Sequence, residues 1–221
     1  MKALFFLIFL IFSLSIKAAE TITWYAYDQP PAYIFNGPYK GSGFVNLSQK
    51  LLIKALPQYK HNEVQASVGR LLHDLKLKKN VCVFGLGENS ERANYVTYSE
   101  PALMNRNVHL LIDKKKATQL SLTEPVNLED LFTEHNLSTN IIDGRFYGDA
   151  IDKVLAQYPN NVLYRSTSSE QALYQMLERK RFDFLLTYPS SAIFAIKSEV
   201  ISDNYQRQLS AIKNSKHSPF Y

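Results

Sequence analysis

One arginine, Arg92, stands in a short polar stretch, GENSERANYVTYSEPA (residues 87–102), between two apolar segments. Gly85 and Gly87 precede it, and glycines allow backbone amides to approach a ligand closely. A guanidinium presents a planar fork of donors that matches a carboxylate. The pattern therefore indicates a carboxylate anchor. Spacing alone also allows a simpler interpretation, in which Arg92 pairs with a nearby acid such as Glu91 and only stabilises the turn.

A second candidate is DGRFYGDA (residues 143–150), where two glycines frame a turn that carries Arg145, Phe146 and Tyr147. The pattern predicts a helix that begins at about Tyr147. Free amides at the start of a helix attract anions, and Arg145 adds positive charge. The turn is thus a candidate ligand contact, although an ordinary strand-to-helix connection would have the same composition.

Two further loops supply aromatic side chains. The loop at residues 28–43 contains Asp28 and Tyr33 together with prolines that stiffen it. Tyr188 ends the apolar stretch FDFLLTY (residues 182–188). These residues predict two walls of a binding cleft, and a rigid surface loop is the alternative for residues 28–43.

Signatures of enzymes and metal sites do not occur in the sequence. There is no G-x-S-x-G motif, no dinucleotide fingerprint and no phosphate-binding lysine loop. The five histidines lack ligand spacing: they are His61, His73, His109, His135 and His217. We expect no cofactor and no metal. The sequence does not exclude a pair of catalytic carboxylates within a cleft.

Strand and helix patterns alternate along the chain, as two βαβαβ units joined near residues 107–116. This order predicts an α/β protein with two lobes, each a mainly parallel sheet flanked by helices. Open α/β sheets bind ligands beyond the carboxyl ends of their strands. The candidate residues all follow predicted strands, so the elements would bring them to one cleft.

Several local expectations accompany this pattern. Asn46 is predicted to cap a helix that ends before Pro57, and residues 114–127 are predicted to be a polar connection. The single cysteine, Cys82, lies in an apolar strand and cannot form an internal disulfide. We expect it to be a buried, inert thiol.

The first 18 residues have the pattern of a cleaved secretory signal: a basic start, an apolar run and small residues. No cysteine follows that would carry a lipid, so no stable membrane anchor is expected. Without Lys2 and Lys17, the 25 basic residues become 23 against 20 acidic ones. This excess is too small and too dispersed for nucleic-acid binding.

The order of these motifs resembles the type II periplasmic (extracellular) solute-binding proteins, in particular the amino-acid-binding class of ABC transporters, solute-binding protein family 3, and a poorly characterised subgroup of it. The likeness covers about residues 20–190. It rests on PPAYIFNG, GSGFVNLSQKLL, SERANYVTYSEPA, NLEDL, DGRFYGDAID and LERKRFDFLLTY. Asn89 stands where that family usually has threonine, and Tyr188 where it often has the acid that holds a ligand's amino group.

The resemblance implies a role for each motif. Arg92 would bind a ligand carboxylate, and the Gly144 to Tyr147 turn would contact the ligand. It implies a signal peptide at 1–18, lobe 1 at 19–108 plus 207–221, and lobe 2 at 109–206. A two-strand hinge at about 107–113 and 206–212 would join the lobes. That family usually adds helices to lobe 1 after the return strand, near which this sequence stops.

The function that the resemblance implies is capture, between two lobes, of a small carboxylate-bearing solute: amino acid-like, peptide-like or an organic acid. The protein would be a periplasmic monomer that serves an ABC transporter permease, and not an enzyme. Two alternatives remain. One is a dehydratase-like periplasmic enzyme that uses an acid such as Asp28, Glu88 or Glu91, and the other is a sensory ligand-binding module.

Overall fold

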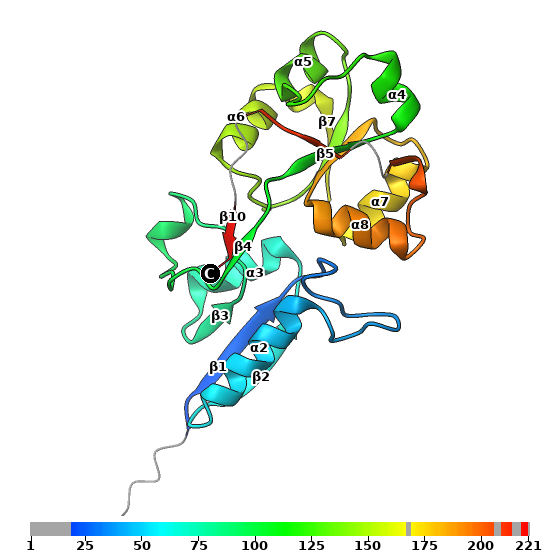
Figure 1. The fold of residues 1–221 in the computed structure, drawn as a ribbon. Helices are drawn as coiled ribbons and strands as arrows, with labels where there is room; N and C mark the ends of the chain where they lie inside the picture. Colours follow the sequence, from blue (N-terminus) through cyan, green and yellow to red (C-terminus); the bar gives the residue numbers. More distant parts are fainter. Residues whose placement is uncertain (1–18, 167–168, 206–208, 214–217, 221) are drawn as a thin grey trace, which may run out of the picture.

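The computed structural model describes residues 19–166, 169–205, 209–213 and 218–220 (Figure 1). The predicted signal segment lies outside these residues. The strands are β1 (Thr21–Ala26), β2 (Lys60–Gln65), β3 (Val81–Val83), β4 (Leu103–Asn105), β5 (His109–Ile112), β6 (Thr139–Ile142), β7 (Val162–Ser166), β8 (Phe184–Thr187), β9 (Leu209–Ala211) and β10 (Ser218–Phe220). The helices are α2 (Phe44–Ala55), α3 (Val68–Leu77), α4 (Lys114–Gln119), α5 (Leu128–Thr133), α6 (Asp149–Gln157), α7 (Glu170–Glu178) and α8 (Pro189–Lys197), with 3-10 helices η1 (Arg92–Asn94), η2 (Pro159–Asn161) and η3 (Asp203–Tyr205).

The first lobe is built on a parallel sheet with the strand order β2-β1-β3. Successive side chains of a strand point to opposite faces, and both faces of β1 are buried here. Tyr25 packs with Leu71 of α3, whereas Ala26 packs with Val45 of α2. The two helices therefore cover opposite faces of the sheet, as the alternating pattern predicts.

The second lobe contains a five-stranded sheet with the order β7-β6-β8-β5-β9. Strands β6, β7 and β8 are parallel, and β5 runs antiparallel to both of its neighbours. Leu110 and Ile112 belong to the core under α5 and α6, while Leu111 belongs to the core under α7 and α8. Both faces are thus buried, which confirms the prediction of a mainly parallel sheet between helices.

Figure 1 shows the two lobes and the chain segments that pass between them. One crossing lies between β4 and β5. The other lies between β9 and β10, and residues 214–217 of it lie outside the described part of the chain. Strand β10 returns to pair antiparallel with β4. The predicted second hinge segment falls partly on residues 206–208, which are also outside the described residues.

One local prediction was wrong. Asn46 does not cap α2, which begins after Gly43 without a side-chain cap. Instead, the Asn46 side chain accepts a hydrogen bond from Ile34 N at 2.8 Å and holds the first loop against the helix. The polar stretch after β5 is not wholly irregular, because the Asp113 side chain accepts from two backbone amides and starts α4.

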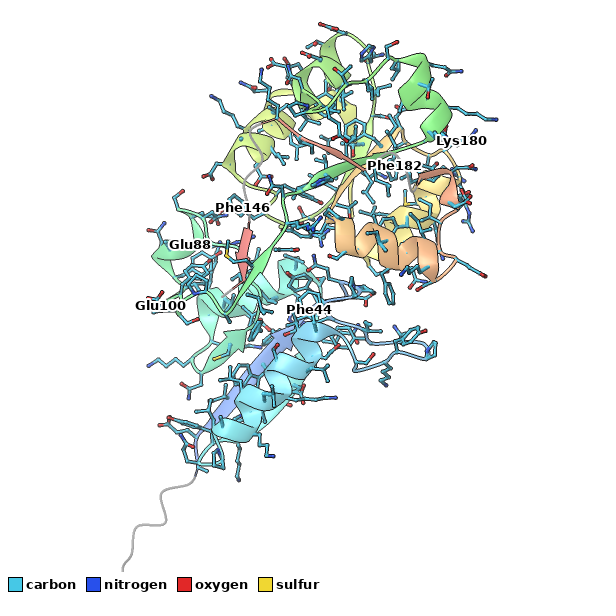
Figure 2. All side chains as sticks on the ribbon, in the orientation of Figure 1. Phe44, Glu88, Glu100, Phe146, Lys180 and Phe182 are labelled. Carbon is cyan, nitrogen blue, oxygen red and sulfur yellow. The ribbon has the colours of Figure 1, made fainter. Side chains whose placement is uncertain are left out.

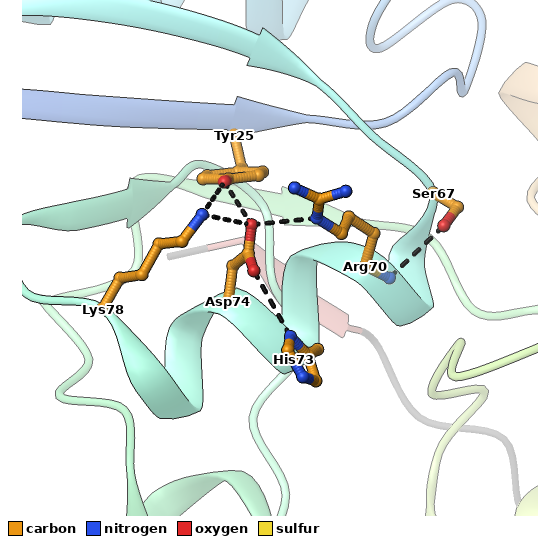
Figure 3. A network of polar contacts seen from close by, with 6 residues as sticks. All are labelled: Tyr25, Ser67, Arg70, His73, Asp74 and Lys78. Carbon is orange, nitrogen blue, oxygen red and sulfur yellow. Dashed lines mark hydrogen bonds and ion pairs between the residues drawn. The ribbon is translucent and has the colours of Figure 1, made fainter.

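A polar network ties α3 to the sheet of the first lobe (Figure 3). The Asp74 carboxylate is 3% exposed, and it accepts hydrogen bonds from Tyr25 Oη, from Lys78 Nζ at 2.8 Å and from Arg70 Nε at 3.1 Å. These donors, with Lys78 and Tyr25 contributing most, hold the pKa of Asp74 well below its usual range. The network fixes the helix that faces the second lobe.

The outer side of α2 carries exposed apolar residues. Leu47 is 50% exposed and Leu51 is 70% exposed. A groove of ≈ 600 Å³ runs between α2, β3 and residues 96–103, and its described lining contains Cys82 and no charged residue. Burial raises the pKa of the Cys82 thiol. The residue is only half-buried, whereas the sequence predicted a fully buried thiol.

Candidate functional site

Arg92 lies at the junction of the two lobes. It opens η1, where its backbone N donates to Asn89 Oδ1 at 2.8 Å. Its guanidinium donates from Nη1 to the carbonyl of Gly87 at 2.6 Å and from Nη2 to the carbonyl of Gly144 at 2.7 Å. Gly144 belongs to the second lobe, so one buried side chain, 4% exposed, joins both lobes. Glu91 is not its partner, because Glu91 pairs with Lys76.

Phe146 packs across the same junction. The guanidinium carbon of Arg92 lies 5.8 Å from the centre of the Phe146 ring, which is cation–π distance. A Cβ added at Gly87 would lie 3.1 Å from Phe146 Cδ1. Figure 2 shows Phe146 beside the part of the first lobe that carries Glu88. Glycine at position 87 is therefore what lets the two loops approach.

Gly144 adopts a left-handed conformation, with φ +74°. A Cβ at this position would lie 3.1 Å from Leu72 Cδ1 and 3.4 Å from Val68 Cγ1, both on α3 of the first lobe. The turn after β6 thus packs directly on α3. Glycine is required here both by the backbone and by the close approach of the lobes.

Arg145 forms a buried ion pair within the second lobe. Its Nη2 lies 2.9 Å from Oε2 of Glu170, and the two side chains are 8% and 1% exposed. The other carboxylate oxygen accepts from Tyr174 Oη at 3.1 Å and from Thr187 Oγ1 at 2.8 Å. Burial disfavours the charge on Arg145, but Glu170 together with Tyr147 and Tyr188 outweighs burial and holds the pKa of the guanidinium well above its usual value.

Two tyrosines enclose Arg145. Its guanidinium carbon lies 5.8 Å from the ring centres of Tyr147 and Tyr188. Tyr147 is buried, and its hydroxyl accepts a hydrogen bond from Ile142 N at 3.0 Å. The backbone amide of Tyr147, which was predicted to attract a ligand anion, donates instead to Asp152 of the same turn.

Tyr27 and Asp28 bring the end of β1 to this region. The Tyr27 hydroxyl donates to the carbonyl of Gly85 at 3.2 Å. Burial raises the pKa of Tyr27 to about 12, against the opposing effect of Arg145. Burial also raises the pKa of Asp28, and the negative charge of Glu170 raises it further. The described residues therefore gather two arginines, two carboxyl groups and several phenols at the junction.

A pocket of ≈ 330 Å³ adjoins this cluster. Its walls come from the first loop of lobe 1 and from α7 and α8 of lobe 2. Tyr39 and Phe194, from opposite lobes, meet edge to face with ring centres 6.3 Å apart. Its lining includes Asp28, Pro30, Phe35, Tyr39, Tyr174 and Phe194.

The predicted site residues do not all meet. Arg92, Gly87, Arg145, Phe146 and Tyr188 come together at the junction. Tyr33 does not: it is 2% exposed, and its hydroxyl donates to Gln49 Oε1 at 2.6 Å inside the first lobe. The Tyr33 ring is buried in the core of the first lobe, and it supports the first loop from that side.

Three residues of the junction were not predicted: Tyr27, Glu170 and Thr187. Glu170 stands in SSEQ, a stretch whose capping-box spacing predicts the start of a helix. That spacing gives no sign of the ion pair between Glu170 and Arg145. Tyr27 and Thr187 are the last residues, or nearly so, of apolar strands. The rule that ligands lie beyond the carboxyl ends of strands would have selected both.

Comparison of the fold with solved structures gives many matches. The substrate-binding protein of an amino acid ABC transporter matches with a TM-score of 0.63 at 15% identity, over 90% of this chain and 83% of that one. The chain has the two-lobed fold of periplasmic binding proteins. A histidine kinase sensor domain similar to periplasmic binding proteins shares this binding-protein fold, with a TM-score of 0.66 at 11% identity over 92% and 80% of the two chains.

A third structure with the binding-protein fold is the ancestral amino acid-binding protein AncCDT-1, described as a precursor of cyclohexadienyl dehydratase. Its TM-score is 0.63 at 20% identity, over 90% of this chain and 77% of that one. At such identities the likeness establishes the fold alone. No family model and no curated protein matches the sequence.

No helix among the described residues has the length and apolarity needed to cross a bilayer. Within the same residues, no three or more His, Cys, Asp or Glu side chains are grouped as a metal site.

Proposed function

We propose that the protein is an exported solute-binding protein that captures a small carboxylate-bearing solute between its lobes. The observation that carries this proposal is the position of Arg92. A buried guanidinium on the first lobe reaches a carbonyl of the second lobe at 2.7 Å. It therefore lies where any solute held between the lobes would meet it.

The present partners of Arg92 are neutral. The charged guanidinium already strengthens these bonds, and a carboxylate can add to this because Arg–carboxylate pairs are frequently bidentate, with a gain in both geometry and energy. A carboxylate that enters the junction offers two charged acceptors in place of the carbonyls of Gly87 and Gly144. Exchange of partners would favour the bound form and would keep both lobes in contact through the solute.

Several aspects of the proposal extend beyond the site. We propose that residues 1–18 direct export, that the mature protein acts as a monomer in the periplasm, and that an ABC transporter permease receives the solute. The support is the apolar start of the sequence and the similarity to the substrate-binding protein of an amino acid ABC transporter.

The proposal is tested by a thermal-shift screen of the chain without residues 1–18 against amino acids, short peptides and organic acids. A ligand that binds only the folded state raises the melting temperature by mass action. Failure of all carboxylates to stabilise the protein, at millimolar concentration, would contradict the proposal.

Arg92→Ala provides the matching variant test. Truncation of one partner of a buried charged contact costs about 2–5 kcal/mol, so affinity should fall roughly 30-fold to several thousand-fold. The exposed Arg181→Ala is the control, with unchanged affinity expected. Titration calorimetry on the best compound of the screen measures both, and an unaltered affinity of the Arg92 variant would remove its role as anchor.

An enzyme on the same scaffold is the second candidate. Burial and the charge of Glu170 raise the pKa of Asp28, which is the direction that favours a carboxyl as a general acid, and one similar fold is described as a dehydratase precursor. Turnover of a carboxylated ring substrate, lost in Asp28→Asn, would favour this candidate. Binding without turnover would favour the first.

A further inference from the structure

The second lobe offers no acid to an amino group at the position where Tyr188 stands. The ring of Tyr188 lies 5.8 Å from the guanidinium carbon of Arg145 and acts as a surface for that cation. An aromatic ring over a guanidinium stabilises positive charge already within the protein. The second lobe therefore uses this position to hold an arginine, not to hold an ammonium group of a solute.

The acid that the second lobe does bring to the junction is already occupied. Glu170 is 1% exposed, and its two oxygens accept from three donors of its own lobe: Arg145, Tyr174 and Thr187. An incoming ammonium group would have to displace a guanidinium from a buried carboxylate. Breaking such a pair leaves a buried charge without a partner, which is strongly unfavourable.

The adjoining pocket suits a flat apolar group. Phe35, Tyr39 and Phe194 line it, together with prolines of the first loop. Its volume of ≈ 330 Å³ is at the small end of ligand pockets. Because Tyr39 and Phe194 come from opposite lobes and meet edge to face, a ring packed beside this pair would contact both lobes and favour offset or edge-on packing.

The pocket and the arginines are connected through shared residues. Tyr174 lines the pocket, and its hydroxyl binds the same Glu170 that holds Arg145. Asp28 lines the pocket on the other side, next to Tyr27, which interacts electrostatically with both Arg92 and Arg145. The pocket therefore lies beside the cluster that contains the two arginines, and Asp28 and Tyr174 belong to both.

We propose that the solute is a carboxylic acid that carries an aromatic ring and has no amino group beside its carboxylate. Arg92 receives the carboxylate, Arg145 adds positive charge nearby, and the ring enters the pocket beside Tyr39 and Phe194. This inference rests on the proposed function and names the class of solute for the same junction.

The test compares two probes that differ by one group: 3-phenylpropionate and L-phenylalanine. Calorimetric titration of the chain without residues 1–18 should give at least tenfold tighter binding for 3-phenylpropionate. L-Arginine serves as a third probe, because Asp28 would attract a cationic side chain if the pocket were built for one.

Variants on α8 separate the ring contact from general effects. Phe194→Ala should weaken the binding of 3-phenylpropionate at least fivefold. Ile193→Ala, at the exposed neighbouring position of the same helix, should leave it unchanged. Thermal unfolding of both variants checks that each remains folded.

The outcomes distinguish this inference from the proposed function. If L-phenylalanine or L-arginine binds as tightly as 3-phenylpropionate, the inference is wrong and solute binding stands. Equal effects of Phe194→Ala and Ile193→Ala would also overturn it, since the ring would lie elsewhere. If none of the three probes and no compound of the wider screen binds, both the inference and the proposed function fail.

Discussion

The two arginines at the junction have different partners and therefore different roles. Arg92 holds two backbone carbonyls, one from each lobe, whereas Arg145 holds a carboxylate within its own lobe. Exchange of these carbonyls for a charged acceptor requires that water or other donors satisfy the carbonyls that are released. The Arg145 pair is a fixed part of the second lobe, and it sets the electrostatic environment that the solute meets.

The dependence of Arg145 on Glu170 gives a stability prediction. Glu170→Gln leaves a buried guanidinium without its counter-charge and should lower the free energy of unfolding by about 3–5 kcal/mol. The double variant Arg145→Met with Glu170→Gln should recover most of that loss, because neither charge then remains. Urea unfolding measures both, and a loss below about 1 kcal/mol in the single variant would show that the pair is solvated.

The sequence points to Arg92 as a candidate site residue, but it does not point to Glu170, the partner of Arg145. Arg92 was identified because its residue type, its preceding glycines and its place after a strand agree. Its actual acceptors are backbone carbonyls, which no side-chain pattern reveals. Glu170 escaped attention because a glutamate in the first turn of a helix already has a local explanation.

At the scale of elements, the turn after β6 determines how closely the lobes meet. Gly144→Ala should destabilise the protein by two effects: a positive φ, worth about 1–2 kcal/mol, and a Cβ that would lie 3.1 Å from Leu72 Cδ1. Gly37, with φ +75° and no atom within 4 Å of an added Cβ, is the matched control for the backbone effect.

The difference between the unfolding free energies of Gly144→Ala and Gly37→Ala in urea therefore measures the cost of the contact between the added methyl group and Leu72. Gly144→Ala should lose about 1–3 kcal/mol more than Gly37→Ala, the usual cost of overpacking. Equal losses in the two variants would mean that α3 and the turn move apart freely in solution.

The Asp74 network predicts how α3 responds to acid. A carboxyl whose pKa is lowered in the folded state contributes stability above its unfolded pKa, about 4, and that contribution is lost as the pH falls through the folded pKa. The difference in melting temperature between wild type and Asp74→Asn should be largest near neutral pH and should shrink below about pH 4. Exposed Asp203→Asn is the control, and a difference independent of pH would contradict the prediction.

The elements were predictable to the extent that they are periodic. Strand β8 is an almost continuous apolar run, β6 ends in two isoleucines before the glycine turn, and α6 and α7 have helical spacing, so these elements were found. Strands β4 and β10 have three residues each, too few for any period. Helix α4 begins at the polar residues KKK, where only the cap of Asp113 marks the start.

At the scale of the whole molecule, the lobes are unequally covered. Leu71 of α3 is fully buried, whereas Leu51 of α2 is 70% exposed. The order of motifs predicted two lobes, and the exact limits proposed for them remain predictions. Sequence alone could not show the exposed side of α2, because an amphipathic pattern indicates an apolar face without naming what covers it.

The exposure of α2 can be measured through stability. Leu71→Ala should cost about 2–5 kcal/mol, as buried truncations do, and Leu51→Ala should change the free energy of unfolding by no more than about 0.5 kcal/mol. A large loss at Leu51, dependent on protein concentration in urea unfolding, would show that another molecule covers this side in solution.

The groove beside α2 has one more consequence. Cys82 is the single cysteine of the sequence, it lines the groove, and burial raises the pKa of its thiol. Alkylation needs the thiolate and access to it, so the reaction should be slow while the first lobe is intact and should yield one label per chain. The rate of alkylation then reports how often the first lobe opens. Because the reporter is native, no substitution is needed to introduce it.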